Sequence, residues 1–126
     1  MTPAVDLLNK LAMAYKLHEY EHDAKASSYG LEAAEKLAVE PQRVFKTLVV
    51  EADNETLAVA VLPVDRQLNL KLMAKAIGMK KVTMADPVAV SRSSGYVLVG
   101  GHRGLEIELS ASDLAQATRA AFWVIT

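Results

Sequence analysis

The chain has 126 residues, of which 52% are hydrophobic, and a formal net charge of −1. A chain of this length buries roughly two thirds of its unfolded surface, which is enough for one domain with its own core. It has no cysteine, so disulfides and thiolate metal sites are excluded. No run reaches the roughly 18 apolar residues of a membrane span, and the N-terminus lacks the pattern of a signal peptide. The composition therefore predicts a cytoplasmic protein without a membrane partner. Because the net charge of the chain is close to zero, no DNA partner is expected.

Helical and extended segments alternate in the first third of the chain. Thr2 is a plausible helix cap and Pro3 suits a first helical turn, and the apolar residues that follow recur at helical spacing. The stretch 15–22 is expected to be extended. The stretch 31–39 is expected to be a second helix, which Pro41 stops.

Two apolar runs, 43–50 and 56–62, flank the turn signal Asp53-Asn54 and predict a β-hairpin. Side chains alternate along a strand, so Lys46 shares a face with Leu48, and both faces are otherwise apolar. The first run is therefore expected to be a fully buried strand. Lysine is almost never fully buried unless it is paired or functional. Lys46 is thus either a residue at a frayed strand end that extends to water or a residue of a functional pocket.

The second half of the chain again mixes strands and helices. The expected elements are a helix over 69–77 capped by Asn69 and closed by Gly78, a strand over 81–84, a short helix from Asp86, a loop over 91–95, a strand over 96–99, a turn over 100–104, a strand over 105–109, a helix over 110–117 with Ser110 and Asp113 in its cap, and a strand over 122–125. The interleaving shows no regular βαβ repeat. It therefore predicts the α+β class, as one domain with a mixed sheet and surrounding helices.

The string His18-Glu19-Tyr20-Glu21-His22 matches the zinc peptidase pattern H-E-x-x-H. That chemistry requires a helix, because only there do two histidines four positions apart lie on one face within reach of one metal ion. In an extended strand they are separated by roughly 13 Å. The surrounding sequence favours a strand, so no metal site is expected. A zinc peptidase is therefore the least favoured of the three functions that the sequence leaves open.

Two loops and one basic segment carry weaker signals. Gly100-Gly101-His102-Arg103-Gly104 lacks the Lys-Ser/Thr end of a phosphate-binding loop and is more typical of a hairpin turn. Ser93-Ser94-Gly95-Tyr96 offers hydroxyls and backbone amides to an anion or carbonyl group, but such a string is more often only a loop. Positive charge gathers in a segment that is most simply a solvated face, and any contact with nucleic acid is expected to be local and salt-sensitive. Its lysines are Lys71, Lys75, Lys80 and Lys81.

Seven segments, spread from one end of the chain to the other, together match the segments of a known protein family in the same order. They are Met1-Thr2-Pro3-Ala4, His18-Glu19-Tyr20-Glu21-His22-Asp23, Glu32-Ala33-Ala34-Glu35-Lys36-Leu37, Val44-Phe45-Lys46-Thr47-Leu48, Lys80-Lys81-Val82-Thr83-Met84-Ala85-Asp86-Pro87, Ser93-Ser94-Gly95-Tyr96 and Arg103-Gly104-Leu105. Together they resemble the YbaK/EbsC family of free-standing editing proteins, which are related to the inserted editing domain of bacterial prolyl-tRNA synthetase.

This resemblance implies a barrel-like mixed sheet and an aminoacyl-tRNA deacylase that acts in trans, chiefly on Cys-tRNA(Pro). It also implies that the substrate's own thiol is the nucleophile, that there is no cofactor, and that the partners are tRNA(Pro) and, as a further partner, prolyl-tRNA synthetase. Lys46 matches the essential catalytic lysine of the family. Other positions match its substrate pocket: Tyr20, Tyr29, Thr47, Ser93, Ser94, Gly95 and Tyr96.

The chain departs from the family in two places. Tyr29-Gly30-Leu31 replaces a Phe-Gly-acidic triplet, so the pocket wall loses a carboxylate. After about residue 96 the family has a long segment with a Gly-Gly-x-Ser-Pro loop. In this chain only residues 97–101 stand in the place of that segment. Gly100 and Gly101 match either that loop or the glycine pair before the next strand, and the second match is favoured because Arg103-Gly104-Leu105 follows at once.

The resemblance makes residues 1–126 one editing domain that lacks this segment. A deletion in the protein and an omission from the sequence would give the same gap, and an intact mass compared with 13.6 kDa separates them. The alternative to the deacylase is a non-catalytic module of the same fold that binds tRNA or an aminoacyl group.

Overall fold

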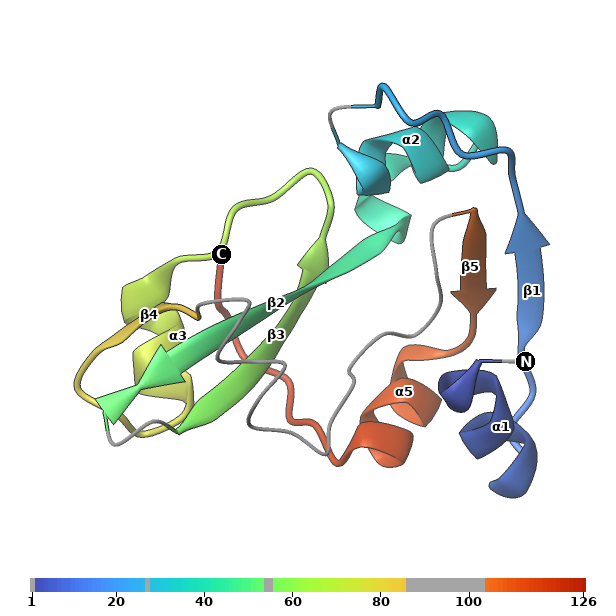
Figure 1. Cartoon of the computed structure of the whole chain (residues 1–126). Helices are drawn as coiled ribbons and strands as arrows, with labels where there is room; N and C mark the ends of the chain where they lie inside the picture. The colour runs from blue at the N-terminus through green and yellow to red at the C-terminus, as the bar shows by residue number, and fades with distance from the viewer. Residues whose placement is uncertain (1, 27, 54–55, 86–103) are drawn as a thin grey trace. The chain divides into compact units, whose positions relative to one another are not determined.

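The computed structural model describes residues 2–26, 28–53, 56–85 and 104–126 (Figure 1). Contacts divide the chain into two units. Unit 1 comprises Met1–Glu40 and Val99–Phe122, and unit 2 comprises Pro41–Leu98 and Trp123–Thr126. Each unit is described by itself. Among the described residues, no helix is both long enough and apolar enough to span a membrane.

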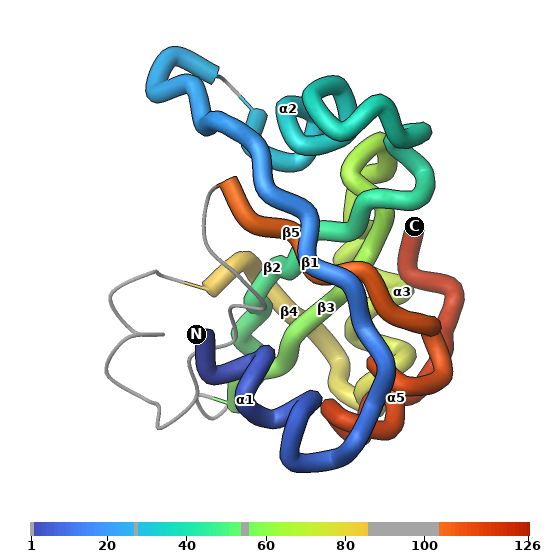
Figure 2. The backbone as a smooth tube through the Cα atoms, turned by 90° about the vertical axis from the view of Figure 1, so that its right-hand side faces the viewer, coloured from blue at the N-terminus to red at the C-terminus, as the bar shows by residue number. Residues whose placement is uncertain are grey.

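Unit 1 contains a two-stranded ribbon accompanied by helices. Its elements are α1 (Pro3–Lys10), β1 (Lys16–Glu19), α2 (Tyr29–Lys36), β5 (Leu105–Glu108) and α5 (Ala111–Thr118). The strands β1 and β5 run side by side and antiparallel (Figure 2), with Lys16 opposite Glu108 and Glu19 opposite Leu105. Val5 of α1 is fully buried. The ribbon therefore brings residues that follow β1 next to residues that precede β5.

Side-chain caps fix where the helices of unit 1 begin. The Thr2 hydroxyl accepts the Val5 amide at 3.3 Å, and Ser110 accepts the Asp113 amide at 3.1 Å. Both predicted helix starts are confirmed. The second helix begins at Tyr29, two positions earlier than expected, because Ser28 caps it.

Unit 2 is a three-stranded antiparallel sheet covered on one face by a helix. Its elements are η1 (Pro41–Arg43), β2 (Phe45–Ala52), β3 (Leu57–Pro63), α3 (Leu70–Ala76) and β4 (Val82–Met84), and the strand order is β3-β2-β4. The predicted hairpin, third helix and short strand are confirmed. The core lies between the helix and the sheet and consists of Val50, Ala52, Ala60, Leu62, Met73, Ala74 and Val82.

Two expectations about strands are wrong. β2 is not fully buried, because only one face packs on the core while Phe45, on the other face, is 53% exposed. The stretch 122–125 is not a strand: Phe122 and Val124 are 74% and 76% exposed, and no described strand pairs with the stretch. Instead, the Ile125 carbonyl accepts the Asn69 amide at 2.7 Å.

The α+β class is confirmed, but the arrangement of the sheet is only partly as expected. All pairs of described strands are antiparallel, in two separate sheets, and these strands do not close into a barrel. The elements expected over 86–103 lie outside the described residues.

Candidate functional site

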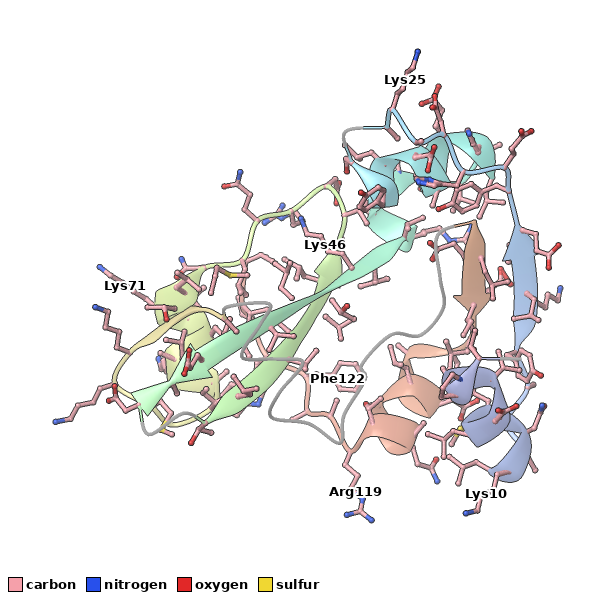
Figure 3. The ribbon with its side chains drawn as sticks, in the orientation of Figure 1. Lys10, Lys25, Lys46, Lys71, Arg119 and Phe122 are labelled. Atoms are coloured by element: carbon pink, nitrogen blue, oxygen red, sulfur yellow. The ribbon has the colours of Figure 1, made fainter. Side chains whose placement is uncertain are left out.

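Lys46 lies at the end of the hairpin where β2 begins and β3 ends (Figure 3). The register places it opposite Leu62, which is 1% exposed, and its side chain is half-buried on the same face as Leu48 and Val50. No carboxylate among the described residues lies within the 4.0 Å of an ion pair with its ammonium. The result is a positive charge at the edge of an apolar surface, without a compensating protein charge in the described part of the chain. Such a group can bind an anion or stabilise a developing oxyanion.

Thr47 follows Lys46 but points to the opposite, solvent-exposed face of β2. Alternation along the strand makes this unavoidable. The structure therefore separates the side chains of these two predicted site residues while keeping their backbones adjacent, and a shared site would use backbone groups of Thr47.

Tyr20 and Tyr29, also predicted to line the pocket, both belong to unit 1. Tyr20 continues the β1–β5 pairing, because its amide donates to the Gly104 carbonyl at 3.0 Å. Gly104 has a φ of +90°, and a Cβ there would lie 2.9 Å from the Tyr20 carbonyl oxygen, so the approach requires glycine. Tyr29, at the start of α2, meets the His22 ring edge to face, with centroids 5.5 Å apart. The remaining predicted positions, Ser93 to Tyr96 with Gly100 and Gly101, lie outside the described residues.

A buried carboxylate on the helix that begins at Tyr29 contacts the segment that follows Tyr20. Glu32 of α2 is 7% exposed. One of its oxygens lies 2.7 Å from His22 Nδ1, and the other accepts the Asp23 amide at 2.7 Å. The Lys36 ammonium lies 3.4 Å from Glu32 Oε2 and also donates to the Glu21 carbonyl. Glu32 and Lys36 thereby tie residues 21–23 to α2, and so connect the two predicted aromatic residues of the pocket.

These contacts hold the pKa of Glu32 below its ordinary value of 4.5. The hydrogen bond with His22 is the largest cause, the Asp23 amide and Lys36 act in the same direction, and burial opposes them. An ionised carboxylate has no proton to donate, so His22 Nδ1–H is the donor.

We expect Glu32→Gln to lower the free energy of unfolding at pH 7, and the difference from the wild type to shrink as the pH falls below 4.5. The reason is that a carboxyl with a lowered pKa binds fewer protons in the folded state, so its stabilisation is full above 4.5 and is lost as the pH falls through the folded-state pKa. Urea unfolding at several pH values measures this. Glu35→Gln, an exposed change on the same helix, is the control and is expected to be neutral at every pH. A difference that does not vary between pH 7 and pH 3 would contradict the assignment.

Glu106 of β5 shows the opposite behaviour, because burial raises its pKa above 4.5. Its folded state therefore binds more protons, and its cost to stability is absent at acid pH and complete at neutral pH. Glu106→Gln should raise the free energy of unfolding at pH 7 but not at pH 3, as measured by urea unfolding. Glu19→Gln, exposed on the neighbouring strand, is the control. An equal gain at both pH values would exclude desolvation of the carboxylate as the cause.

The helix that the zinc peptidase alternative requires is not found at residues 18–22. His18 lies in β1 and His22 follows the strand without helical structure, so the two imidazoles are not presented on one helical face. His18 Nε2 instead lies 3.5 Å from a Glu108 carboxylate oxygen, and His22 is held by Glu32. The described residues contain no group of three His, Cys, Asp or Glu side chains that could hold a metal ion.

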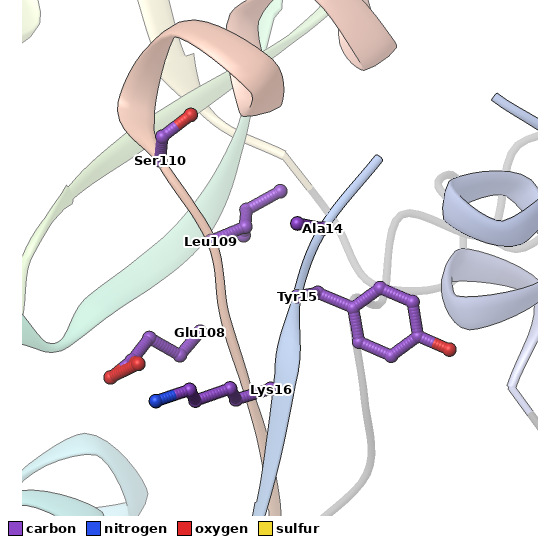
Figure 4. A pocket seen from close by; sticks show the side chains of 6 residues that line it. All are labelled: Ala14, Tyr15, Lys16, Glu108, Leu109 and Ser110. Atoms are coloured by element: carbon purple, nitrogen blue, oxygen red, sulfur yellow. The ribbon is translucent and has the colours of Figure 1, made fainter. Parts of the chain in front are cut away.

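An open depression of about 270 Å³ lies beside the β1–β5 ribbon of unit 1 (Figure 4). It is lined by Ala14, Tyr15, Lys16, Glu108, Leu109 and Ser110. None of the predicted site residues lines it, and its Tyr15 hydroxyl is already bonded to Asn9 at 2.8 Å. We do not assign the active site to this depression.

Sequence reasoning missed the contacts of Glu32. Lys36 follows it by four positions, which is the usual spacing of an exposed ion pair on a helix. The signal that could have revealed its burial is its place directly before Ala33 and Ala34, the two alanines of the core face.

The chain matches a model of the "Aminoacyl-tRNA editing domain" over residues 24–101. It is 30% identical to EbsC of Enterococcus faecalis, to which a Cys-tRNA(Pro)/Cys-tRNA(Cys) deacylase activity is attributed, over 99% of this chain and 93% of EbsC. That alignment spans 156 positions against the 126 residues of this chain, so at least 30 positions hold residues of EbsC alone. A proline–tRNA ligase of Moorella thermoacetica is 31% identical over 71% of this chain, which is only 17% of the ligase.

Two solved structures share the fold. A hypothetical protein, APE2540, superposes with a TM-score of 0.72 at 22% identity, covering 92% of this chain and 93% of its own. A protein described as a trans-editing enzyme for prolyl-tRNA synthetase also gives 0.72, at 16% identity, covering 96% of this chain and 95% of its own. The family model covers more than half of the chain, and the relative at 30% identity aligns along nearly all of it, while the superpositions show the same fold. The chain therefore belongs to the aminoacyl-tRNA editing domain family.

Proposed function

We propose that the protein is an aminoacyl-tRNA deacylase that acts in trans and hydrolyses the ester of mischarged tRNA, chiefly Cys-tRNA(Pro). Its relatives support the substrate class, since a Cys-tRNA(Pro) deacylase activity is attributed to EbsC and another relative is a proline–tRNA ligase. The observation that carries the proposal is Lys46, a half-buried ammonium at the edge of an apolar face with no carboxylate partner among the described residues. Residues 1–126 act as one editing domain in this proposal, and its partners are tRNA(Pro) and prolyl-tRNA synthetase.

In this proposal Lys46 stabilises the negative charge that develops on the ester carbonyl oxygen. An ammonium held next to apolar side chains is poorly shielded by water, so its attraction for an oxyanion is strong. The pocket orients the ester, and it needs no nucleophile of its own. The residues proposed to line it are Tyr20, Tyr29, Thr47, Ser93, Ser94, Gly95, Tyr96, Gly100 and Gly101.

The nucleophile is the substrate's thiol. After loss of its proton to solvent, the cysteine sulfur attacks the carbonyl carbon of its own ester, and a carbon–sulfur bond forms. The bond from that carbon to the ribose oxygen then breaks, and the ribose oxygen takes up a proton. The cyclic thioester so released is hydrolysed by water to free cysteine. The absence of cysteine from the chain is compatible with this route, because no protein thiol takes part.

The alternative is a non-catalytic module that binds aminoacyl-tRNA with the same fold. It is favoured by the residues of EbsC that have no counterpart in this chain. Incubation of the purified protein with Cys-tRNA(Pro) distinguishes the two: the deacylase releases cysteine with turnover and leaves Pro-tRNA(Pro) intact. Binding of the ester without release would instead establish the module.

A further inference from the structure

Positive charge in unit 2 is concentrated in one stretch between Asp65 and Asp86. This stretch contains five basic residues and no acidic one: Arg66, Lys71, Lys75, Lys80 and Lys81. Because the chain has a net charge of −1 and this stretch has +5, the rest of the chain has −6. The polarity is therefore local, in a protein that is close to neutral as a whole.

All five basic side chains are exposed, and none forms an ion pair with a described residue. Lys71 and Lys75 are separated by one turn of α3 and share its outer face, while Met73 and Ala74 of the same helix are buried in the core. Like charges four positions apart destabilise a helix. Here no acidic neighbour on the helix relieves that repulsion, so the charges are available to a partner.

The path of the chain distributes these charges along the whole length of the sheet. β3 ends at Pro63, opposite Phe45 and thus beside Lys46, and Arg66 follows in the next turn. The chain then passes through α3 to Lys80 and Lys81, directly before β4, whose Val82 pairs with Ala52 at the far end of β2. From Lys46 to Ala52 the strand extends about 20 Å at ~3.3 Å per residue. Basic groups therefore occur near the Lys46 end, along the helix and at the opposite end.

We propose that this basic surface, made by Arg66, Lys71, Lys75, Lys80 and Lys81, binds the phosphate backbone of the tRNA whose 3′ ester is cleaved at Lys46. The inference rests on the proposed function, because that function fixes the 3′ end of the nucleic acid at Lys46. A nucleic-acid strand presents a phosphate every few ångströms, so several phosphates lie within 20 Å of its end. Lys46 and the basic surface belong to the same unit, so one strand can reach both.

The test compares two double variants with equal losses of charge. Lys71→Gln/Lys75→Gln removes two charges from the basic surface, and Lys10→Gln/Lys25→Gln removes two exposed charges from unit 1 (Figure 3). Binding of deacylated tRNA is measured by fluorescence anisotropy over a range of salt concentrations. We expect the first variant to weaken binding on the order of tenfold and to reduce the slope of log K against log salt by roughly 1.5 to 2. The control should match the wild type.

Kinetics supply a second readout. With Cys-tRNA(Pro), Lys71→Gln/Lys75→Gln should raise KM and leave kcat unchanged, because the groups bind the tRNA away from the ester. Lys80→Gln/Lys81→Gln, outside the helix, should have the same effect and so excludes a local defect of α3. Equal affinities and salt slopes for all variants would overturn the proposal, as would a loss seen only when prolyl-tRNA synthetase is present, since that would assign the surface to contact with the synthetase.

The two proposals can fail separately. Binding of deacylated tRNA requires no hydrolysis, so a protein that shows the expected salt slopes but releases no cysteine would retain the basic surface and lose the deacylase. A protein that releases cysteine with unchanged KM in both lysine variants would retain the deacylase and lose the basic surface.

Discussion

Lys46→Ala is expected to lower the rate of cysteine release from Cys-tRNA(Pro) by about 10²–10³-fold or more, the usual effect of removing a group that stabilises an oxyanion. The fold should be retained, because the half-buried ammonium has no protein carboxylate partner among the described residues. An uncharged side chain on the apolar face should change the free energy of unfolding by less than about 1 kcal/mol, or raise it. Single-turnover deacylation and urea unfolding of the same preparation measure the two quantities.

Lys46→Met is the matched control for packing, since it retains most of the aliphatic stem and removes only the charge. Both variants should be equally inactive if the charge is what matters. A loss of several kcal/mol of stability in Lys46→Ala would make the lysine a structural partner of another group, and the site assignment would then be wrong.

The second large effect concerns the amino acid on the tRNA. If the substrate's side chain attacks the ester, cysteinyl-tRNA(Pro) should react at least about 10²-fold faster than alanyl-tRNA(Pro), whose side chain has no nucleophile. Seryl-tRNA(Pro) should react almost as slowly as alanyl-tRNA(Pro). A thiol with a pKa of ~8.5 supplies a few per cent of thiolate at neutral pH, whereas an alcohol supplies almost none. The rate should rise with pH and level off above the pKa of the thiol.

The measurement is deacylation of one tRNA charged with each of the three amino acids, together with trapping of the cyclic thioester. Equal rates for all three esters would indicate a water molecule positioned by the enzyme and would exclude the substrate-assisted route. In that case Lys46→Ala would still be expected to be inactive, so the two predictions test different parts of the mechanism.

Features that depend on neighbours within three or four positions could be predicted from the sequence. Thr2, Asn69 and Ser110 each cap the helix that follows them, because a cap needs only a short polar side chain and the next turn of backbone. The alternation along β2 is equally local, and the predicted placement of Lys46 and Leu48 on one face is confirmed, whereas which face packs on the core was not predicted.

Features that depend on distant partners could not be predicted. The strand expected over 122–125 has suitable residues, but a strand also needs an available neighbour, and the described strands offer it none. The burial of Glu32 arises from the fold of residues 21–23 onto α2, which helical periodicity does not indicate. The full pocket stays a prediction for the same reason: Tyr20 and Lys46 belong to different units, and the loop over 93–96 lies outside the described residues.

The alternation of β2 also makes editing activity a reporter of hairpin register. Lys46 faces the core only because it is opposite Leu62, and a slip of one residue would turn it outward and bring Thr47 in. A variant altered only between β2 and β3 could therefore lose activity with Lys46 chemically intact and its helix content unchanged. Inactive variants of this connection should be examined for hairpin pairing before their residues are assigned to the chemistry.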